Sequence, residues 1–235
     1  MNGFRRAFAA EWFKITRRTK YKVFFLILSV LYAGAVLLSV KLSGGAQRGI
    51  ALEGLILNIY MPLVMFLGAN DLIAGEIRTH SIHMAVSAPF SRTQLFLAKF
   101  LAVFLNAAAP AVIICVIDTG LAVFGRSLGD GHQLFYLLID LVPAAALAAF
   151  ACCVPLVIPG SALSMLICIC VYIVLRLTGI FAGFSAALFT SYSAWHPLFL
   201  GGMRFISLLA RILAIVSPLA FFLSAGCCMM ERKRF

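Results

Sequence analysis

One polar stretch, residues 70–99, concentrates the residue types that can do chemistry. It contains Glu76, His80 and His83, whose spacing places them on one face of a helix. A carboxylate and two imidazoles on one face are the ligands of a two-His, one-carboxylate metal site. The pattern is not the H-E-x-x-H of zinc enzymes, and a helix in the membrane interface has no obvious enclosing cavity. We therefore expect no metal and interpret the His residues as ordinary polar positions.

Catalysis is a second use for the same stretch, because intramembrane hydrolases also place Glu and His near the membrane. Such enzymes usually need two or more motifs on different spans so that a site can close. The other His residues, His132 and His196, are both expected on the opposite side of the membrane. No G-x-S-x-G or H-E-x-x-H motif occurs. We expect no catalytic residue and no enzyme activity in this chain.

The elements around this stretch are almost entirely apolar. The 235 residues are 63% hydrophobic and 11% charged, with a mean hydropathy of +1.07, whereas soluble domains are about half apolar and a quarter charged. A spanning helix needs about 20 mostly apolar residues, and six such runs predict an all-α, polytopic membrane protein with one transmembrane domain. The predicted spans are about 23–43, 54–73, 95–124, 134–155, 161–181 and 206–230.

Charge sets the expected orientation. Residues 1–22 are basic with apolar residues at helical spacing, which predicts an amphipathic helix on an anionic membrane surface. With the N-terminus inside, the cytoplasmic side holds the Lys and Arg residues of 1–22, Arg78, Arg92, Lys99, Arg232, Lys233 and Arg234. The outside holds only Lys41, Arg48, Arg126 and Arg204. The bias places both termini in the cytoplasm and explains the net charge of +11 without a nucleic-acid partner.

Four charged residues are predicted inside spans at a common depth. Asp118, Asp140, Arg176 and Arg211 each lie five or six residues from the outer end of a span, which is about 8–9 Å below the outer surface. Isolated charges at such depth cost several kcal/mol, so they should be paired. We expect an ion-pair belt that ties four helices together, either as a purely structural feature or as a gate that rearranges.

A third use for the polar stretch is contact with a soluble partner. Residues 74–88 can form a short cytoplasmic helix that Pro89 ends, and Ser91 or Thr93 is suited to cap the next span. A charged helix between two spans can seat in a groove on a partner. A push on it would then move both spans.

The residues here resemble a known family. The run DLIAGE (71–76), then APFSR (88–92) and LAK (97–99), resembles the signature of ABC type-2 transporter permeases. In that family the second span ends in an acid and a Glu, followed by a coupling helix, a P-x-S-R turn and a Lys in the third span. The sequence EWFK (11–14) with Arg17 and Arg18 is similar to the family's elbow-helix motif. One departure is His80-Ser81, where the family often has Gly-Thr.

The resemblance implies a half-transporter. A second permease subunit, identical or related, would complete the pathway, and an ABC ATPase dimer would bind at the coupling helix. This chain has no G-x-x-x-x-G-K-[ST] loop, so ATP and Mg would belong to the partner and no cofactor to this chain. The implied coupling residues are Glu76, Arg78, Ser81, Pro89, Ser91 and Arg92. The implied elbow residues are Glu11, Trp12, Lys14, Arg17 and Arg18.

The family also lines its pathway with the second and fifth spans. Carried onto this sequence, the pathway candidates are Asn58, Tyr60, Met61, Asn70, Ser164, Tyr172 and Arg176, each of which is either a packing residue or a substrate contact. A re-entrant helical pair is implied over residues 182–205. The implied function is export of a peptide-like or amphipathic substrate, such as an antimicrobial peptide, or immunity to one, across a bacterial cytoplasmic membrane. A non-transporting scaffold or sensor subunit remains the alternative.

Overall fold

A computed structural model describes residues 2–43, 52–79, 91–123, 133–158, 160–182 and 205–232. Every regular element in these ranges is a helix, as predicted. The elements are α1 (Asn2–Arg17), α2 (Thr19–Ser43), η1 (Leu52–Tyr60), α4 (Met61–Ala69), η2 (Asn70–Ala74), α5 (Gly75–Arg78), α7 (Arg92–Val123), α8 (Gln133–Val157), α9 (Ser161–Ala182) and α10 (Phe205–Arg232).

Four helices in the described ranges are long and apolar enough to cross a membrane. They are Ile56–Arg78, Arg92–Ile117, Leu137–Val157 and Ser161–Thr178. The protein therefore has the character of a membrane protein. The boundary predicted between the fourth and fifth spans, after residue 155 and before residue 161, lies between the end of α8 and the start of α9.

The helix over residues 52–78 is continuous but irregular. Two π-helical stretches, η1 and η2, flank the α-helical stretch α4. Pro62 lies at the start of α4, and it has no N–H to donate to the carbonyl of Asn58 four residues earlier. The helix continues to Arg78, past the span end expected near residue 73. The first polar residues of the predicted coupling segment (residues 74–94, called the coupling segment below) are therefore an extension of the second span.

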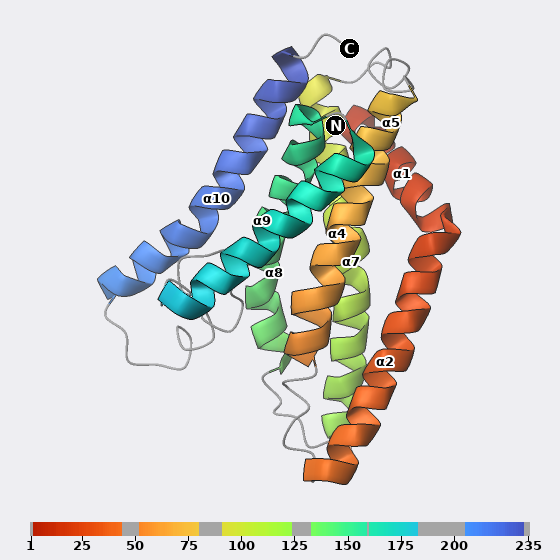
Figure 1. The fold of residues 1–235 in the computed structure, drawn as a ribbon, viewed down its shortest axis with the longest axis vertical. Helices are drawn as coiled ribbons and strands as arrows, with labels where there is room; N and C mark the ends of the chain where they lie inside the picture. Colours follow the sequence, from red (N-terminus) through yellow and green to blue (C-terminus); the bar gives the residue numbers. More distant parts are fainter. Residues whose placement is uncertain are drawn as a thin grey trace.

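The core forms where α4, α7, α8 and α10 pack together (Figure 1). α8 lies against α4, α7 and α10, and its inner face is built from small residues. Ala144, Ala148 and Ala151 are fully buried. Small side chains let helix backbones approach closely, which is how helices associate when lipid removes the hydrophobic driving force.

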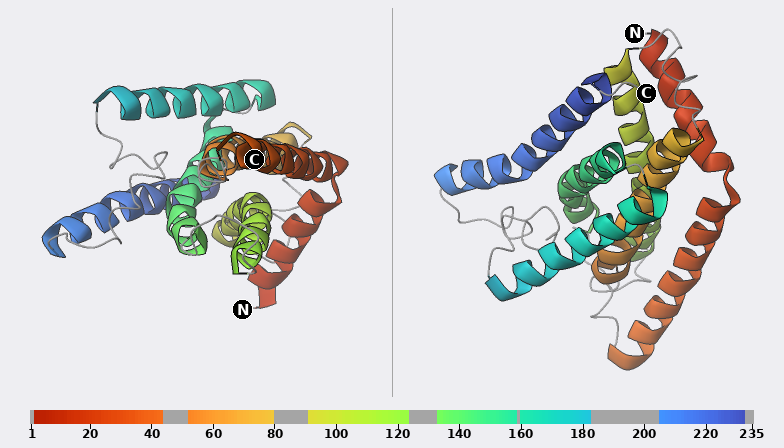
Figure 2. Two further views of the ribbon diagram at one scale, coloured as in Figure 1. Left: turned by 90° about the horizontal axis from the view of Figure 1, so that it is seen from below. Right: turned by 45° about the horizontal axis from the view of Figure 1, so that its top comes forward.

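Two helices lie at the margins of this core. Figure 2 shows α2 and α9 diverging from the central helices on different sides. In α9 only 11% of the most apolar window is buried, and Leu166, Ile173 and Val174 are exposed. An exposed apolar face of this size marks contact with lipid or with another protein.

α1 packs along α7 and ends at a sharp turn into α2. The turn is closed by two backbone hydrogen bonds, from the N–H of Arg18 to the carbonyl of Ile15 (3.0 Å) and from the N–H of Tyr21 to the carbonyl of Arg18 (3.2 Å). The start of α1, the end of α10 and α5 all lie at one end of the helix bundle, at the top of Figure 1. The central part of the coupling segment, 80–90, and the predicted re-entrant region, 183–204, lie outside the described residues.

Candidate functional site

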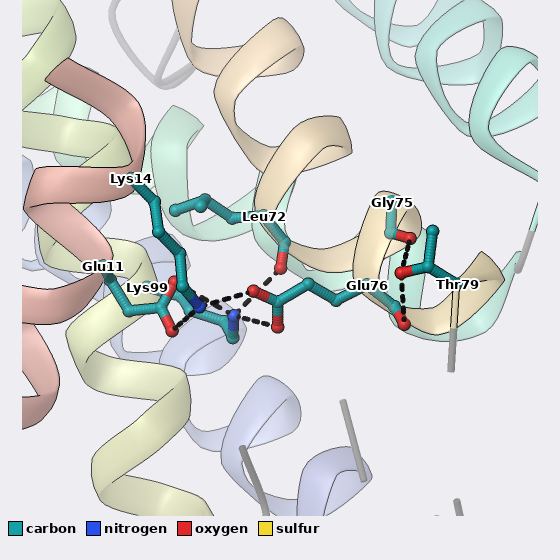
Figure 3. A network of polar contacts seen from close by, with 7 residues as sticks. All are labelled: Glu11, Lys14, Leu72, Gly75, Glu76, Thr79 and Lys99. Carbon is teal, nitrogen blue, oxygen red and sulfur yellow. Dashed lines mark hydrogen bonds and ion pairs between the residues drawn. The ribbon is translucent and has the colours of Figure 1, made fainter. Parts of the chain in front are cut away.

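Four charged side chains from three helices meet at the end of the bundle that carries α5. Glu11 and Lys14 come from α1, Glu76 from α5 and Lys99 from α7; we name them the Glu76 cluster (Figure 3). The Glu76 carboxylate lies between the two lysines, with Oε1 2.7 Å from Lys14 Nζ and Oε2 2.7 Å from Lys99 Nζ. The second acid, Glu11, is 2.9 Å from Lys14 and 3.2 Å from Lys99. Two acids and two bases therefore balance in one network.

Lys99 is the most enclosed member, since only 1% of it is exposed. A buried ammonium is costly unless its three donors find acceptors. Lys99 Nζ donates to Glu76 Oε2 and to the carbonyl oxygen of Leu72 at 2.9 Å, and it pairs with Glu11 at 3.2 Å. Two of the three ammonium donors thus have acceptors, and the contact to Glu11 Oε2 is an ion pair without a hydrogen bond. Removal of either acid would leave the ammonium undercompensated.

Lys14 is the member nearest to water, with 42% of its side chain exposed. Burial alone would lower the pKa of Lys14, but hydrogen bonds to Glu76 and Glu11 outweigh it and raise the pKa above its ordinary value. Lys14 therefore remains charged throughout the neutral range, and the cluster keeps its balance.

A second group of polar side chains surrounds Asp71 in η2. Asp71 Oδ2 accepts a hydrogen bond from the hydroxyl of Tyr21 at 2.6 Å and lies 3.0 Å from Arg18 Nη1. Lys20 also forms an ion pair with this oxygen. We name these four residues the Asp71 cluster. It joins the turn between α1 and α2 to the second span, one and a half helical turns before Glu76.

The two clusters connect α1 to the polar end of the second span at two levels. Because α7 contributes Lys99, a displacement of α5 must either carry α1 and α7 with it or break buried ion pairs. The coupling segment begins in α5. Its first residues are thus mechanically tied to two other helices.

The far end of the coupling segment is ordered by a reciprocal cap. The N–H of Gln94 donates to Ser91 Oγ at 3.2 Å, and the N–H of Ser91 donates to Gln94 Oε1 at 3.4 Å. This S-x-x-Q arrangement is a capping box, which satisfies two backbone donors that a helix N-terminus otherwise leaves open. Of the two cap residues expected, Ser91 holds the position.

The start of α7 is also attached to the end of α10. Arg92 Nη1 donates to the carbonyl oxygen of Glu231 at 3.1 Å. One turn further on, the Phe96 ring lies against Gly226, so closely that a Cβ there would be 2.1 Å from Phe96 Cζ. The segment 80–90 is therefore flanked by contacts to α1 and α7 on one side and to α10 on the other.

The predicted pathway residues form two hydrogen-bonded pairs between the second span and α9. Ser164 Oγ donates to Asn70 Oδ1 at 3.0 Å, and the Tyr172 hydroxyl donates to the carbonyl oxygen of Asn58 at 2.9 Å. The latter carbonyl is the one that lacks a donor from Pro62. Asn58 lies in η1 and Asn70 in η2, so both π-helical stretches are contact points of α9. Tyr60 and Met61 are both buried, and whether they contact a substrate stays a prediction.

The remaining predicted residues divide between the surface and undescribed parts of the chain. The Trp12 ring stacks on Phe8, with ring centroids 6.1 Å apart, and the Arg17 guanidinium lies 4.4 Å from the Phe13 ring centroid. Arg78 is exposed at the end of α5. His80, Ser81, His83 and Pro89 lie outside the described residues.

The predicted belt of intramembrane ion pairs stays a prediction. Asp140 is buried on α8, and Arg176 lies half-buried on α9. The side chains of Asp118 and Arg211 are outside the described part of the chain.

Sequence reasoning named Glu11, Lys14, Arg18 and Glu76 but not Lys99 or Asp71 as site residues. The sequence did contain an indication of their role. Lys99 and Asp71 both lie at the edge of apolar runs, where a charged side chain needs a partner. Glu76 is buried, and its carboxylate connects α5 to α1 and α7. Its predicted contact with an ATPase stays a prediction.

Within the described ranges no group of three or more His, Cys, Asp or Glu could hold a metal ion. Comparison of the sequence with models of protein families and with curated proteins finds no match. The function must therefore be argued from the geometry.

Proposed function

We propose that this chain is the permease subunit of an ATP-binding-cassette exporter, powered by a separate ATPase dimer that binds the coupling segment. The observation that carries the proposal is the Glu76 cluster. It places the start of the coupling segment in a buried ion-pair network with α1 and α7. This is the arrangement needed to convert a push from a soluble partner into a movement of membrane helices.

The proposal includes six spans. α2 has 25 residues and α10 has 28, which are lengths that cross a bilayer of about 30 Å at 1.5 Å per residue. Together with the four helices already identified, they would give an even number of crossings. The start of α1 and the end of α10 lie at the same end of the bundle (Figure 1), which supports this count. The excess of Lys and Arg at that end supports a cytoplasmic position in a bacterial inner membrane.

The pathway is proposed to run between the second span and α9. Two hydrogen bonds from α9 hydroxyls join these helices, and hydrogen bonds between membrane helices contribute only about 0.6 kcal/mol each on average. α9 is otherwise weakly buried, so a modest force can separate it from the second span. An amphipathic or peptide-like substrate matches a route that combines such polar groups with an apolar surface.

A second permease subunit would cover the exposed apolar face of α9. Leu163, Leu166, Ile173, Val174 and Leu177 are exposed along it. A pathway bounded on one side by α9 and the second span requires a facing wall, which an identical or related subunit would supply.

The test is to co-purify the chain with a candidate phosphate-loop ATPase subunit and to measure ATP hydrolysis in lipid with a candidate amphipathic peptide. We expect a stable complex and hydrolysis that the substrate stimulates. Failure to bind any such ATPase would contradict the proposal. Binding without stimulation by any candidate, and without transport in vesicles, would favour the scaffold or sensor function.

Crosslinking locates the contact. In a variant with the exposed Cys170 and Cys228 changed to Ser, Arg78→Cys should crosslink to a single Cys on the ATPase surface. Arg126→Cys is the matched control, because that position is expected on the other side of the membrane. Equal crosslinking at both positions would contradict the orientation.

A further inference from the structure

A groove of about 300 Å³ opens where α1, the start of α2 and the middle of α7 meet. Its volume is at the small end of the range for ligand pockets, roughly 300–1,000 Å³, so it suits one part of a larger molecule. The lining residues come from four elements. They are Trp12, Thr16, Tyr21, Lys22, Phe25, Tyr60, Asn106, Ala109, Pro110 and Ile113.

The lining has one charged residue, Lys22, beside a mostly apolar wall. Elsewhere in the described chain Lys14, Arg18, Lys20 and Lys99 all form ion pairs, whereas Lys22 forms none with a described residue. Trp12 and Tyr21 line the same groove, and amphipathic aromatic rings of this kind collect at membrane–water interfaces. The groove thus offers an unneutralised cation at its mouth and an apolar surface behind it.

The position along α7 matches the boundary between lipid headgroups and acyl chains. α7 has 32 residues, or about 48 Å at 1.5 Å per residue, which exceeds a hydrocarbon core of about 30 Å by roughly 18 Å. The polar first part of α7, which carries Lys99, accounts for much of this excess. Asn106 to Ile113 then extends about 10 Å further along the helix, into the apolar layer.

We propose that this groove binds an anionic phospholipid of the cytoplasmic leaflet. Its phosphate would pair with Lys22, and one acyl chain would lie along Ala109, Pro110 and Ile113. A soluble anion would gain nothing from this apolar wall. A cationic peptide would be repelled by Lys22 and by the neighbouring basic residues of α1. The inference rests on the membrane placement within the proposed function and is independent of the ATPase.

The bound lipid would lie between α1 and α7. The Glu76 cluster joins the same two helices close to this groove. Trp12 lines the groove and Glu11, its neighbour on α1, pairs with Lys99. The site therefore lies at the junction through which the coupling segment would act. Lipid composition would then affect how firmly α1 is held.

The test is native mass spectrometry of the purified full chain with equal amounts of phosphatidylglycerol and phosphatidylcholine. We expect a single preferred phosphatidylglycerol adduct. Lys22→Gln should weaken that adduct about five-fold, the effect of one basic residue at an anionic surface. Arg6→Gln is the matched control, because Arg6 is an exposed cation on α1 away from the groove, and it should leave the adduct unchanged.

A second pair of variants tests the apolar part. Ile113→Trp should fill the groove and remove the adduct, whereas Ile117→Trp, at an exposed position one turn further along α7 that does not line the groove, should not. Equal losses from Lys22→Gln and Arg6→Gln would overturn the site in favour of general surface charge. Loss of the phosphatidylglycerol adduct on addition of inorganic phosphate would also overturn the proposal. So would displacement of the adduct by an amphipathic peptide, if Lys22→Gln did not change that displacement. None of these measurements requires the ATPase, so the two proposals fail separately.

Discussion

Lys99 Nζ donates a hydrogen bond to Glu76 Oε2 at 2.7 Å, and this contact joins α7 to the last turn of the second span. The two residues are 23 positions apart; Glu76 lies near the start of the coupling segment, and Lys99 lies beyond its end. A displacement of α5 relative to α7 must therefore break this ion pair or carry α7 along.

The first prediction concerns this pair. Lys99→Met leaves Glu76 and Glu11 with only Lys14, and loss of one partner of a buried ion pair costs about 3–5 kcal/mol. We expect a clear fall in the unfolding temperature in detergent and loss of coupling to the ATPase. Arg6→Met is the control, since Arg6 is exposed and outside both clusters.

A compensating variant separates charge from packing. Adding Glu76→Gln to Lys99→Met removes one uncompensated acid, so part of the lost stability should return. The control is additivity. If the loss of stability in the double variant equalled the sum of the losses in Lys99→Met and Glu76→Gln, the two residues would not be energetically coupled.

The second prediction concerns the joint between α7 and α10. Gly226→Ala adds a Cβ that would be 2.1 Å from Phe96 Cζ, and forced overpacking of this kind costs about 1–3 kcal/mol. We expect destabilisation that Phe96→Leu partly reverses. Gly34→Ala is the matched control, because a Cβ there meets no atom within 4 Å. Destabilisation of similar size at both positions would contradict this explanation.

The third prediction concerns the attachment of α9. Tyr172→Phe together with Ser164→Ala removes both hydroxyl donors, and the loss of stability should be about 1 kcal/mol in total. Cys168 is buried on α9, so its labelling by a lipid-permeable maleimide should become faster. Exposed Cys170 on the same helix is the internal standard.

Thr178→Val is the control for that labelling, because the hydroxyl of Thr178 bonds only within α9, to the carbonyl of Leu175 at 3.0 Å. It should not change the labelling of Cys168. An unchanged rate in the double variant would mean that other contacts hold α9 in place.

The fourth prediction is a pH dependence. The pKa of Lys14 is raised in the folded state above the ordinary 10.5, so its stabilising effect is fully present below that value and is lost as pH rises through the folded pKa. The difference in unfolding temperature between wild type and Lys14→Gln should be constant from pH 7 to about 10 and shrink at higher pH. A difference that shrinks instead between pH 7 and 9 would assign the effect to another group.

Composition was sufficient to predict the helical class and the positions of the apolar runs, because lipid leaves few alternatives to helices. It was not sufficient for the end of the second span. Glu76 is polar, so the second span was expected to end before it, near residue 73, but pairing with Lys14 and Lys99 offsets the cost of burying the carboxylate. Hydropathy is assigned to each residue separately, so it contains no information on Lys14, which pairs with Glu76 from 62 positions away.

The site residues show the same limit. Motif similarity identified Glu11 and Glu76 as members of two separate motifs. The spacing of these motifs in the sequence did not indicate that the ammonium group of Lys99 would lie close to both carboxylates. The π-helical stretches could not be predicted from the sequence either, because a proline such as Pro62 indicates only that a helix is kinked or interrupted nearby. The match between the Asn58 carbonyl and the Tyr172 hydroxyl depends on how α9 packs, which is a property of the folded chain.

The π-helical stretch η2 has a consequence for rotation. A π turn is an α-helical turn with one residue too many, so converting η2 to regular α-helix would shift the register of everything after it by one residue. Each residue of an α-helix corresponds to about 100° of rotation. Such a conversion would turn Glu76 away from Lys99 while leaving the helix continuous. The ion pairs of Glu76 with Lys14 and Lys99 therefore oppose this rotation, because it would separate the charges.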